Sequence, residues 1–205
     1  MTAASTLLGA TLAMISVTQA ANISDCTNIS SNSERLACYD LASGRTATSA
    51  THGPGNWDLR SSINPLDDST TTIALLFENA ERKGFGEKRG SLIIRCRSNE
   101  TDVYISWGKY LGNDSGSIYE ETKNITLRLD NQKATTTSWD VSTDNEATFA
   151  PKAIPLAREI ATASRMVAQT IPFGESPRTL EFDLTGAADA VKGVAETCNW
   201  KLETK

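Results

Sequence analysis

The chain has 205 residues, of which 39% are hydrophobic and 22% are charged, and its formal net charge is −5. This length suits one globular domain with a small appendage, and the composition is not that of a collagen, a coiled coil or a disordered chain. The basic residues form no cluster longer than the pairs Arg82-Lys83 and Lys88-Arg89. Because no basic stripe is present to follow a phosphate backbone, we do not expect nucleic acid as a partner.

The first twenty residues have the pattern of a signal peptide. Residues 7–17 form an apolar run, and Thr18-Gln19-Ala20 before Ala21 is a small-residue cleavage site. The run is shorter than the roughly 20 apolar residues that cross a bilayer, and no later segment has the pattern of a transmembrane helix. We therefore predict that residues 1–20 direct export and are then removed, which leaves a mature chain without a transmembrane segment.

Four cysteines follow the predicted cleavage point: Cys26, Cys38, Cys96 and Cys198. An even number in an exported chain predicts two disulfides, and three pairings are possible. We favour Cys26–Cys38 with Cys96–Cys198, because each bond then lies within one module. The chain has no Cys-x-x-Cys motif, and its single histidine, His52, lies in a stretch of Ser, Thr, Gly and Pro. We therefore expect no metal site and no cofactor.

A bond between Cys26 and Cys38 requires the chain to turn between them. On one continuous helix the twelve-residue spacing would place their Cα atoms about 18 Å apart, whereas a disulfide needs about 4.4–6.8 Å. The turn is predicted at residues 28–33, which are rich in Asn and Ser. A Ser-x-x-Glu capping box then predicts a helix over residues 32–43. Residues 21–44 are therefore expected to form a disulfide-closed helical element.

The rest of the chain is predicted to be rich in strands. Residues 45–55 contain almost no large apolar side chain and end in Gly-Pro-Gly, so we interpret them as a linker before a β-rich domain at 56–205. β-Branched and alternating apolar patterns predict strands at 56–61, 70–78, 91–97, 101–109, 118–130, 135–140, 166–172 and 179–184, with a turn-rich loop at 63–69. Helical spacing predicts helices at 151–163 and 186–197. The expected fold is mainly β, either an antiparallel sandwich or a curved sheet, with one or two packed helices.

No group of residues has the pattern of a catalytic site. A histidine in a polar linker, as at His52, is poorly placed to act as the oriented base of a nucleophile. Asp67 and Asp68 are adjacent carboxylates, but neighbours in an extended chain point to opposite faces, and no apolar pocket flanks them to raise a pKa. We therefore interpret them as solvated loop residues and expect no enzyme activity.

A second group of residues has features of a binding surface. Arg128 and Asp130 lie on one face of a predicted strand by their i, i+2 spacing, and Trp139 with Asp140 could pair with them across the sheet. Tryptophan and arginine are enriched in binding hot spots. The alternative, which we favour, is a tryptophan-anchored core with a surface ion pair.

The order of short motifs in the chain resembles the type VI secretion-associated VasI/TagO family. The motifs are a signal peptide followed by SERLACYD, Trp57 with PLDDS, LIIRC, VYISWGKYL, LRLD followed by TSWDVS, EFDLTG and ETCNW. The resemblance covers nearly the whole mature chain. It implies a periplasmic accessory protein of a Gram-negative secretion apparatus, with secretion from the cell as the alternative location and no catalytic residue to carry over.

Two functions from different classes follow. The first is a non-enzymatic periplasmic accessory or binding protein that contacts an envelope protein, such as a component of the secretion apparatus. Its partner-binding residues are predicted to be Trp57, Asp67, Asp68, Arg128, Asp130 and Trp139. The alternative is a cell-wall-directed hydrolase, or an inhibitor of such a hydrolase, that uses the Asp67-Asp68 loop. The sequence does not indicate an oligomeric state.

Overall fold

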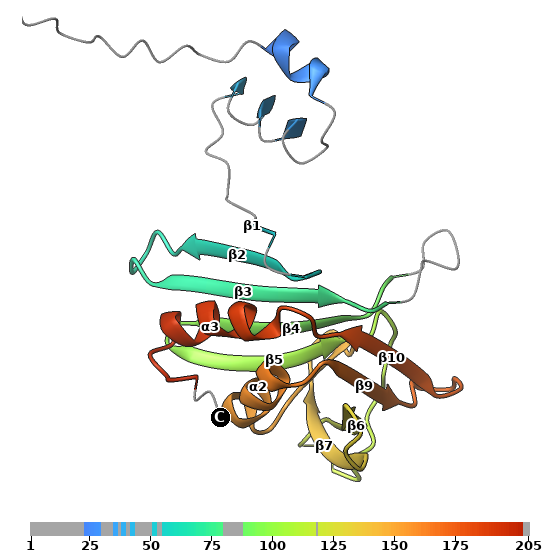
Figure 1. Ribbon diagram of the computed structural model, residues 1–205. Coiled ribbons are helices and arrows are strands. Elements are labelled where there is room, and N and C mark those ends of the chain that lie inside the picture. The colour runs from blue at the N-terminus through green and yellow to red at the C-terminus, as the bar shows by residue number, and fades with distance from the viewer. Residues whose placement is uncertain are drawn as a thin grey trace, which may run out of the picture. The chain divides into compact units, whose positions relative to one another are not determined.

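The computed structural model describes residues 23–29, 35–36, 38–39, 42–43, 51–52, 55–79, 88–117 and 119–202 (Figure 1). The chain divides into two compact units, Met1–Ala47 and Thr48–Lys205. The predicted signal peptide at 1–20 lies outside the described residues. Within the described part of the chain, no helix is long and apolar enough to cross a membrane.

The first unit contains the predicted disulfide between Cys26 and Cys38, whose Cα atoms are 5.6 Å apart. Cys26 lies in η1, a 3₁₀-helix at Ile23–Asn28, and its side chain is fully buried. Cys38 lies in the segment predicted as a helix at 32–43, and the described residues of that segment up to residue 42 are helical. The remainder of the predicted turn, residues 30–33, lies outside the described residues.

The second unit is built on one antiparallel sheet, in which the described strands have the order β1-β2-β3-β4-β5-β8-β7-β6-β9-β10. The strands are β1 (Thr51–His52), β2 (Asp58–Ile63), β3 (Thr70–Phe77), β4 (Ser91–Arg97), β5 (Glu100–Ser106), β6 (Thr122–Leu129), β7 (Thr135–Val141), β8 (Ala147–Phe149), β9 (Arg165–Thr170) and β10 (Arg178–Asp183).

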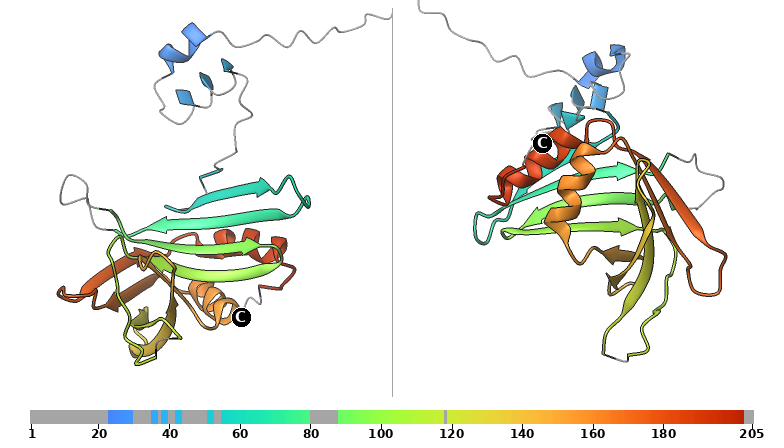
Figure 2. Two further views of the ribbon diagram at one scale, coloured as in Figure 1. Left: turned by 180° about the vertical axis from the view of Figure 1, so that it is seen from behind. Right: turned by 60° about the horizontal axis from the view of Figure 1, so that its bottom comes forward.

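The sheet curves strongly, and its last strand comes back toward the end of β3 (Figure 2). At this point the backbone N–H of Asn79 donates to the carbonyl oxygen of Glu181 at 2.8 Å. The predicted antiparallel, mainly β fold is therefore confirmed, and of its two predicted forms the curved sheet is the one found.

Two of the strands, β1 and β8, were not predicted from the sequence. Thr51–His52, which the sequence places in a linker, form β1 and pair with β2, so the predicted linker contains a short strand. A Cβ atom at Gly55 would lie 2.0 Å from the carbonyl oxygen of Thr185, so the end of the predicted linker packs against the domain. β8 has three residues, which is too few for an alternating pattern to be recognised.

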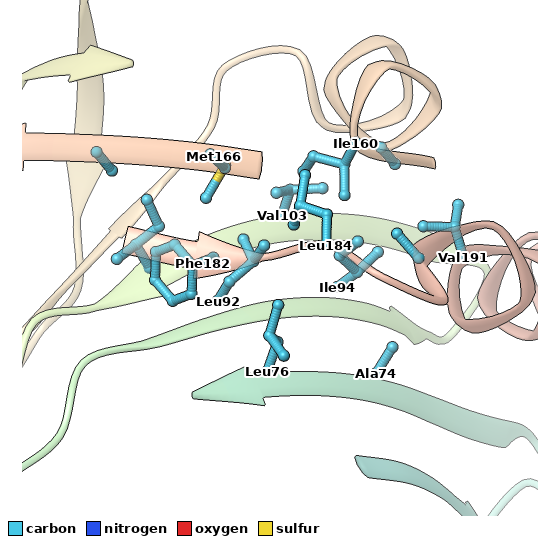
Figure 3. Packing of buried hydrophobic residues seen from close by; sticks show 14 of the residues in the cluster. Ala74, Leu76, Leu92, Ile94, Val103, Ile160, Met166, Phe182, Leu184 and Val191 are labelled. Atoms are coloured by element: carbon cyan, nitrogen blue, oxygen red, sulfur yellow. The ribbon is translucent and has the colours of Figure 1, made fainter. Parts of the chain in front are cut away.

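Both helices of the second unit pack on the face of the sheet that carries the core. α2 (Ala153–Thr162) contacts β5, and α3 (Ala187–Thr197) contacts β3 and β4. In Figure 3, Ile160 from α2 lies beside Val103 of β5, and Val191 from α3 lies on the side of Ile94 of β4. α2 begins at Ala153 and contains Pro155 in its first turn. At this position the missing N–H of proline is not needed for a helical hydrogen bond.

The second predicted disulfide, Cys96–Cys198, joins β4 to the residue after α3, with Cα atoms 5.6 Å apart. The indole Nε1 of Trp200 donates to the hydroxyl of Thr101 on β5 at 2.9 Å. The segment that follows α3 is therefore fixed to two neighbouring strands, by one covalent bond and one hydrogen bond.

Candidate functional site

The two tryptophans predicted to lie on a binding surface are core residues. Trp57 is fully buried, and Trp139 is almost fully buried. The Nε1 of Trp139 donates to the hydroxyl of Thr137 at 2.9 Å, whereas the Nε1 of Trp57 has no partner among the described residues. Because a docking residue needs an exposed side chain, this burial favours the alternative of a tryptophan-anchored core, and a role of either tryptophan in partner binding stays a prediction.

Arg128 and Asp130 do not face Trp139. β6 pairs with β7 in the register that places Lys123 opposite Trp139, so the predicted cross-strand pairing is wrong. Arg128 is exposed at the other end of the hairpin. The carboxylate of Asp130 accepts hydrogen bonds from the N–H groups of Ser164 and Arg165, each at 2.9 Å. Asp130 therefore stabilises the connection between α2 and β9.

The turn between β2 and β3 places exposed apolar side chains beside two carboxylates. Leu66 is 92% exposed and Ile63 is 68% exposed, and Asp67 and Asp68 are exposed with them. We call these four residues the acidic turn. Sequence reasoning identified the aspartates, but it did not identify Leu66, because an apolar residue in a turn-rich loop does not show its exposure.

Hydrogen bonds within the turn fix its conformation. The N–H of Asp68 donates to the carbonyl oxygen of Asn64 at 2.9 Å, and the N–H of Asn64 donates to that of Ser69 at 2.8 Å. The carboxylate of Asp67 accepts from the hydroxyl of Ser69 at 2.7 Å and from its N–H at 3.1 Å. The hydroxyl contact, followed by the N–H contact, lowers the pKa of Asp67. Asp67 is therefore an ionised turn residue, whereas a general acid needs a raised pKa.

A hollow adjoins the acidic turn. Its lining residues are Asp67, Ser69, Thr70, Ser98, Asn99, Gly193, Glu196, Thr197 and Asn199. They come from the turn, from the β4–β5 connection and from the end of α3, and the side chains of Asn199 and Asn99 are hydrogen-bonded at 3.0 Å. The charged lining residues are two carboxylates, Asp67 and Glu196. The charged groups that line this hollow are therefore acidic.

A groove of about 500 Å³ lies at the other end of the sheet. Its floor consists of Asn124 and Thr126 from β6, Thr136 from β7 and Gln169 from β9. These side chains share a face because Thr126 lies opposite both Thr136 and Gln169. The intervening residues of β6 and β9 point into the core, so the floor is on the outer face of the sheet. None of the floor side chains is charged.

One wall of the groove contains an ion pair between a buried lysine and an exposed aspartate. The side chain of Lys123 is 5% exposed, and its Nζ is 2.7 Å from Oδ1 of Asp114. The other carboxylate oxygen of Asp114 accepts the backbone N–H of Asn124 at 3.0 Å. Burial tends to raise the pKa of Asp114, but hydrogen bonds from Lys123 and Asn124, with the charge of Lys123, outweigh it and lower the pKa. The two opposite charges leave this wall without net charge.

Another part of the lining is apolar and comes from the β9–β10 connection, residues 171–174. Phe173 is 73% exposed. Its ring meets Tyr110 edge-on, with centroids 6.4 Å apart and planes at 82°. Gly112 has a φ of +66°, and a Cβ there would lie 3.0 Å from the Cβ of Phe173. Phe173 is therefore held from two sides while most of its side chain remains accessible. Sequence reasoning placed residues 171–172 at the end of a predicted strand and did not identify Phe173, whereas the strand ends at Thr170.

The described residues include no group of three or more His, Cys, Asp or Glu side chains that could hold a metal ion.

The chain matches a known protein family: the model of the type VI secretion system VasI/EvfG family matches residues 25–200. The chain belongs to the VasI family. The predicted family resemblance is therefore confirmed, and membership associates the protein with type VI secretion.

Other comparisons add little to the VasI assignment. Among solved structures, invasion associated protein B from Bartonella henselae is similar to this chain, with 9% sequence identity and a TM-score of 0.46. The similarity covers 70% of this chain and 94% of that chain. Comparison with curated proteins gives no match. In this VasI family protein, the acidic turn and the groove are the two surfaces considered below as binding sites.

Proposed function

We propose that this VasI family protein is a non-enzymatic accessory protein of the type VI secretion apparatus. It is exported to the periplasm and contacts a protein component of the apparatus through the acidic turn. Family membership supports the association with secretion. The predicted signal peptide supports export, as do the two disulfides, because disulfides persist in oxidising compartments such as the periplasm.

The observation that carries the docking proposal is the exposure of Leu66 on a turn whose conformation is fixed. Full burial of a leucine side chain contributes about 1.5–3 kcal/mol. The hydrogen bonds within the turn mean that little backbone freedom is lost when Leu66 enters a pocket, and such preorganisation favours binding. A rigid, exposed aliphatic side chain is therefore suited to act as an anchor for a protein partner.

The charges around Leu66 indicate the chemistry of the partner surface. Asp67 and Asp68 directly follow the anchor in the chain, and Glu196 lines the adjoining hollow. Complementary charge favours encounter and orientation. We therefore expect the partner to present an apolar pocket for Leu66 with Lys or Arg side chains at its rim.

The same residues give no support to a cell-wall hydrolase. Asp67 is exposed and its pKa is lowered by Ser69. Glycoside hydrolysis needs one carboxylic acid with a raised pKa and a second carboxylate at a defined separation. A solvated, ionised Asp67 that accepts two hydrogen bonds within its own turn fits docking better than proton transfer.

Photo-crosslinking in cells tests the proposal. A photoreactive amino acid replaces Leu66, and in a control protein it replaces Gln132, which is exposed on the β6–β7 turn. We expect position 66 to crosslink to a protein of the secretion apparatus, and we expect position 132 to give no such product. Loss of the product in a strain without the apparatus genes is the second control. Equal crosslinking from both positions would contradict docking through the acidic turn.

A further inference from the structure

We propose that the groove is a binding site for a neutral glycan. In this site the sugar hydroxyls lie on the polar floor, and the apolar face of one sugar ring packs on Phe173. The inference goes beyond docking through the acidic turn and uses none of its residues. It rests on three features of the groove: the floor, the aromatic wall and the absence of net charge.

The floor presents hydrogen-bonding groups that suit hydroxyls. The hydroxyls of Thr126 and Thr136 are 2.8 Å apart and bond to each other, which leaves each oxygen with further acceptor capacity and leaves one O–H free to donate. The amide nitrogen of Gln169 donates to Thr179 at 2.8 Å, while its carbonyl oxygen accepts no hydrogen bond from the described residues. A sugar hydroxyl both donates and accepts, so it can pair with each of these groups.

The aromatic wall suits the other side of a sugar ring. The face of a phenyl ring carries partial negative charge, and it attracts weakly polarised C–H groups such as those on one face of a pyranose. Phe173 is already held by Tyr110 and Gly112. Stacking on Phe173 therefore costs little additional ordering of the protein.

The charges of the groove indicate that its ligand is neutral. Lys123 and Asp114 are the charged residues of the lining, and they form an ion pair with each other at 2.7 Å. An anionic or cationic ligand would compete with this pair rather than meet an unpaired charge. The remaining polar lining residues carry amides or hydroxyls.

An extended peptide fits the groove less well than a glycan. Peptides commonly bind as an added strand at an open sheet edge, but the floor strand β6 is internal, with β7 and β9 on its two sides. The floor also has no apolar pocket for a side-chain anchor, because its members are Asn, Thr and Gln. The groove volume of about 500 Å³ lies within the usual range of small-ligand sites, about 300–1,000 Å³.

The test is a titration of the isotope-labelled protein, with both disulfides formed, followed by amide NMR shifts. The probes are the tetramer of N-acetylglucosamine, cellotetraose and an uncharged Gly-Ser tetrapeptide. We expect at least one sugar to shift amides of the lining residues at millimolar concentration or below. Phe173→Ala should weaken this binding by about tenfold or more, equivalent to about 1.4 kcal/mol.

Tyr119→Ala is the matched control, because Tyr119 is an exposed aromatic residue that does not line the groove. It should bind the sugar as the wild-type protein does. Because Phe173 is exposed, Phe173→Ala should keep the fold, which its amide spectrum verifies. The proposal is overturned if neither sugar shifts the lining amides, if only the tetrapeptide shifts them, or if Phe173→Ala binds as tightly as wild type.

Discussion

The acidic turn and the groove are built in opposite ways. The acidic turn is held by hydrogen bonds between residues two to five positions apart, such as those between Asp67 and Ser69. The groove combines residues 113–114, three strands of the sheet and Phe173, so it exists only after the sheet has formed. The difference teaches that a local turn can expose a single anchor for a protein, whereas a surface assembled across strands can surround a small ligand.

The largest expected effect concerns the disulfide beside the hollow that adjoins the acidic turn. Cys96–Cys198 closes a loop with a sequence separation of 102 residues, so Cys96→Ala/Cys198→Ala should lower the free energy of unfolding of the second unit by about 4–5 kcal/mol. Urea denaturation followed by tryptophan fluorescence measures the loss. In variants that remain folded, the amides of Asn99 and Asn199 should shift more than those of the groove floor.

Cys26→Ala/Cys38→Ala is the matched control for this disulfide prediction. It removes a bond in the first unit that spans 12 residues, with an expected contribution of about 3 kcal/mol to that unit. If both double variants shift the fluorescence transition equally, the assignment of Cys96–Cys198 as the principal covalent constraint of the second unit is wrong.

The second effect separates the groove from the acidic turn. Asp114→Asn leaves the buried Lys123 without its carboxylate partner. Because Asp114 itself is exposed, we expect a loss of about 1.5–3 kcal/mol, as for a hydrogen bond to a charged group. Asp68→Asn is the control at the acidic turn, where a surface substitution should change stability by no more than about 0.5 kcal/mol. Chemical denaturation measures both changes, and equal losses would show that the Lys123–Asp114 pair does not stabilise the fold more than an exposed carboxylate does.

The smallest effect is a pH dependence at the acidic turn. The pKa of Asp67 is lowered, chiefly by the Ser69 hydroxyl, so its contribution to turn stability is present above the unfolded-state pKa of about 3.9. It is lost as the pH falls through the folded-state pKa. Ser69→Ala should raise the pKa of Asp67 toward its ordinary value and leave that of Asp114 unchanged. NMR titration of the aspartate carboxyl carbons reads both, and an unchanged Asp67 in this variant would refute the assigned cause.

Local patterns in the sequence predicted much of the fold. Runs of β-branched and apolar residues located β3 and β4, and alternation of apolar with polar residues located β5 and β6. The cysteine spacing required the turn before Cys38. Patterns could not supply the register of β6 on β7, because spacing along one strand determines the face of a residue but not its cross-strand neighbour. That limit explains the incorrect pairing of Arg128 with Trp139.

The two candidate sites also differ in how far they could be predicted from local sequence patterns. Asp67 and Asp68 could be identified from sequence because a turn is a local feature. The groove floor could not, because Thr126, Thr136 and Gln169 are unremarkable strand residues until the sheet register places them together. Trp57 shows a different limit, since a tryptophan pattern does not distinguish a core residue from an exposed anchor.

The central claim is that the protein partner docks on the acidic turn and not in the groove. The crosslinking experiment tests this claim most directly when the photoreactive residue is placed either at position 66 or at position 173. The account predicts a crosslink from position 66 to a protein of the type VI secretion apparatus and no protein crosslink from position 173. A crosslink to that protein from position 173 alone would contradict the account, because it would place the protein partner in the groove.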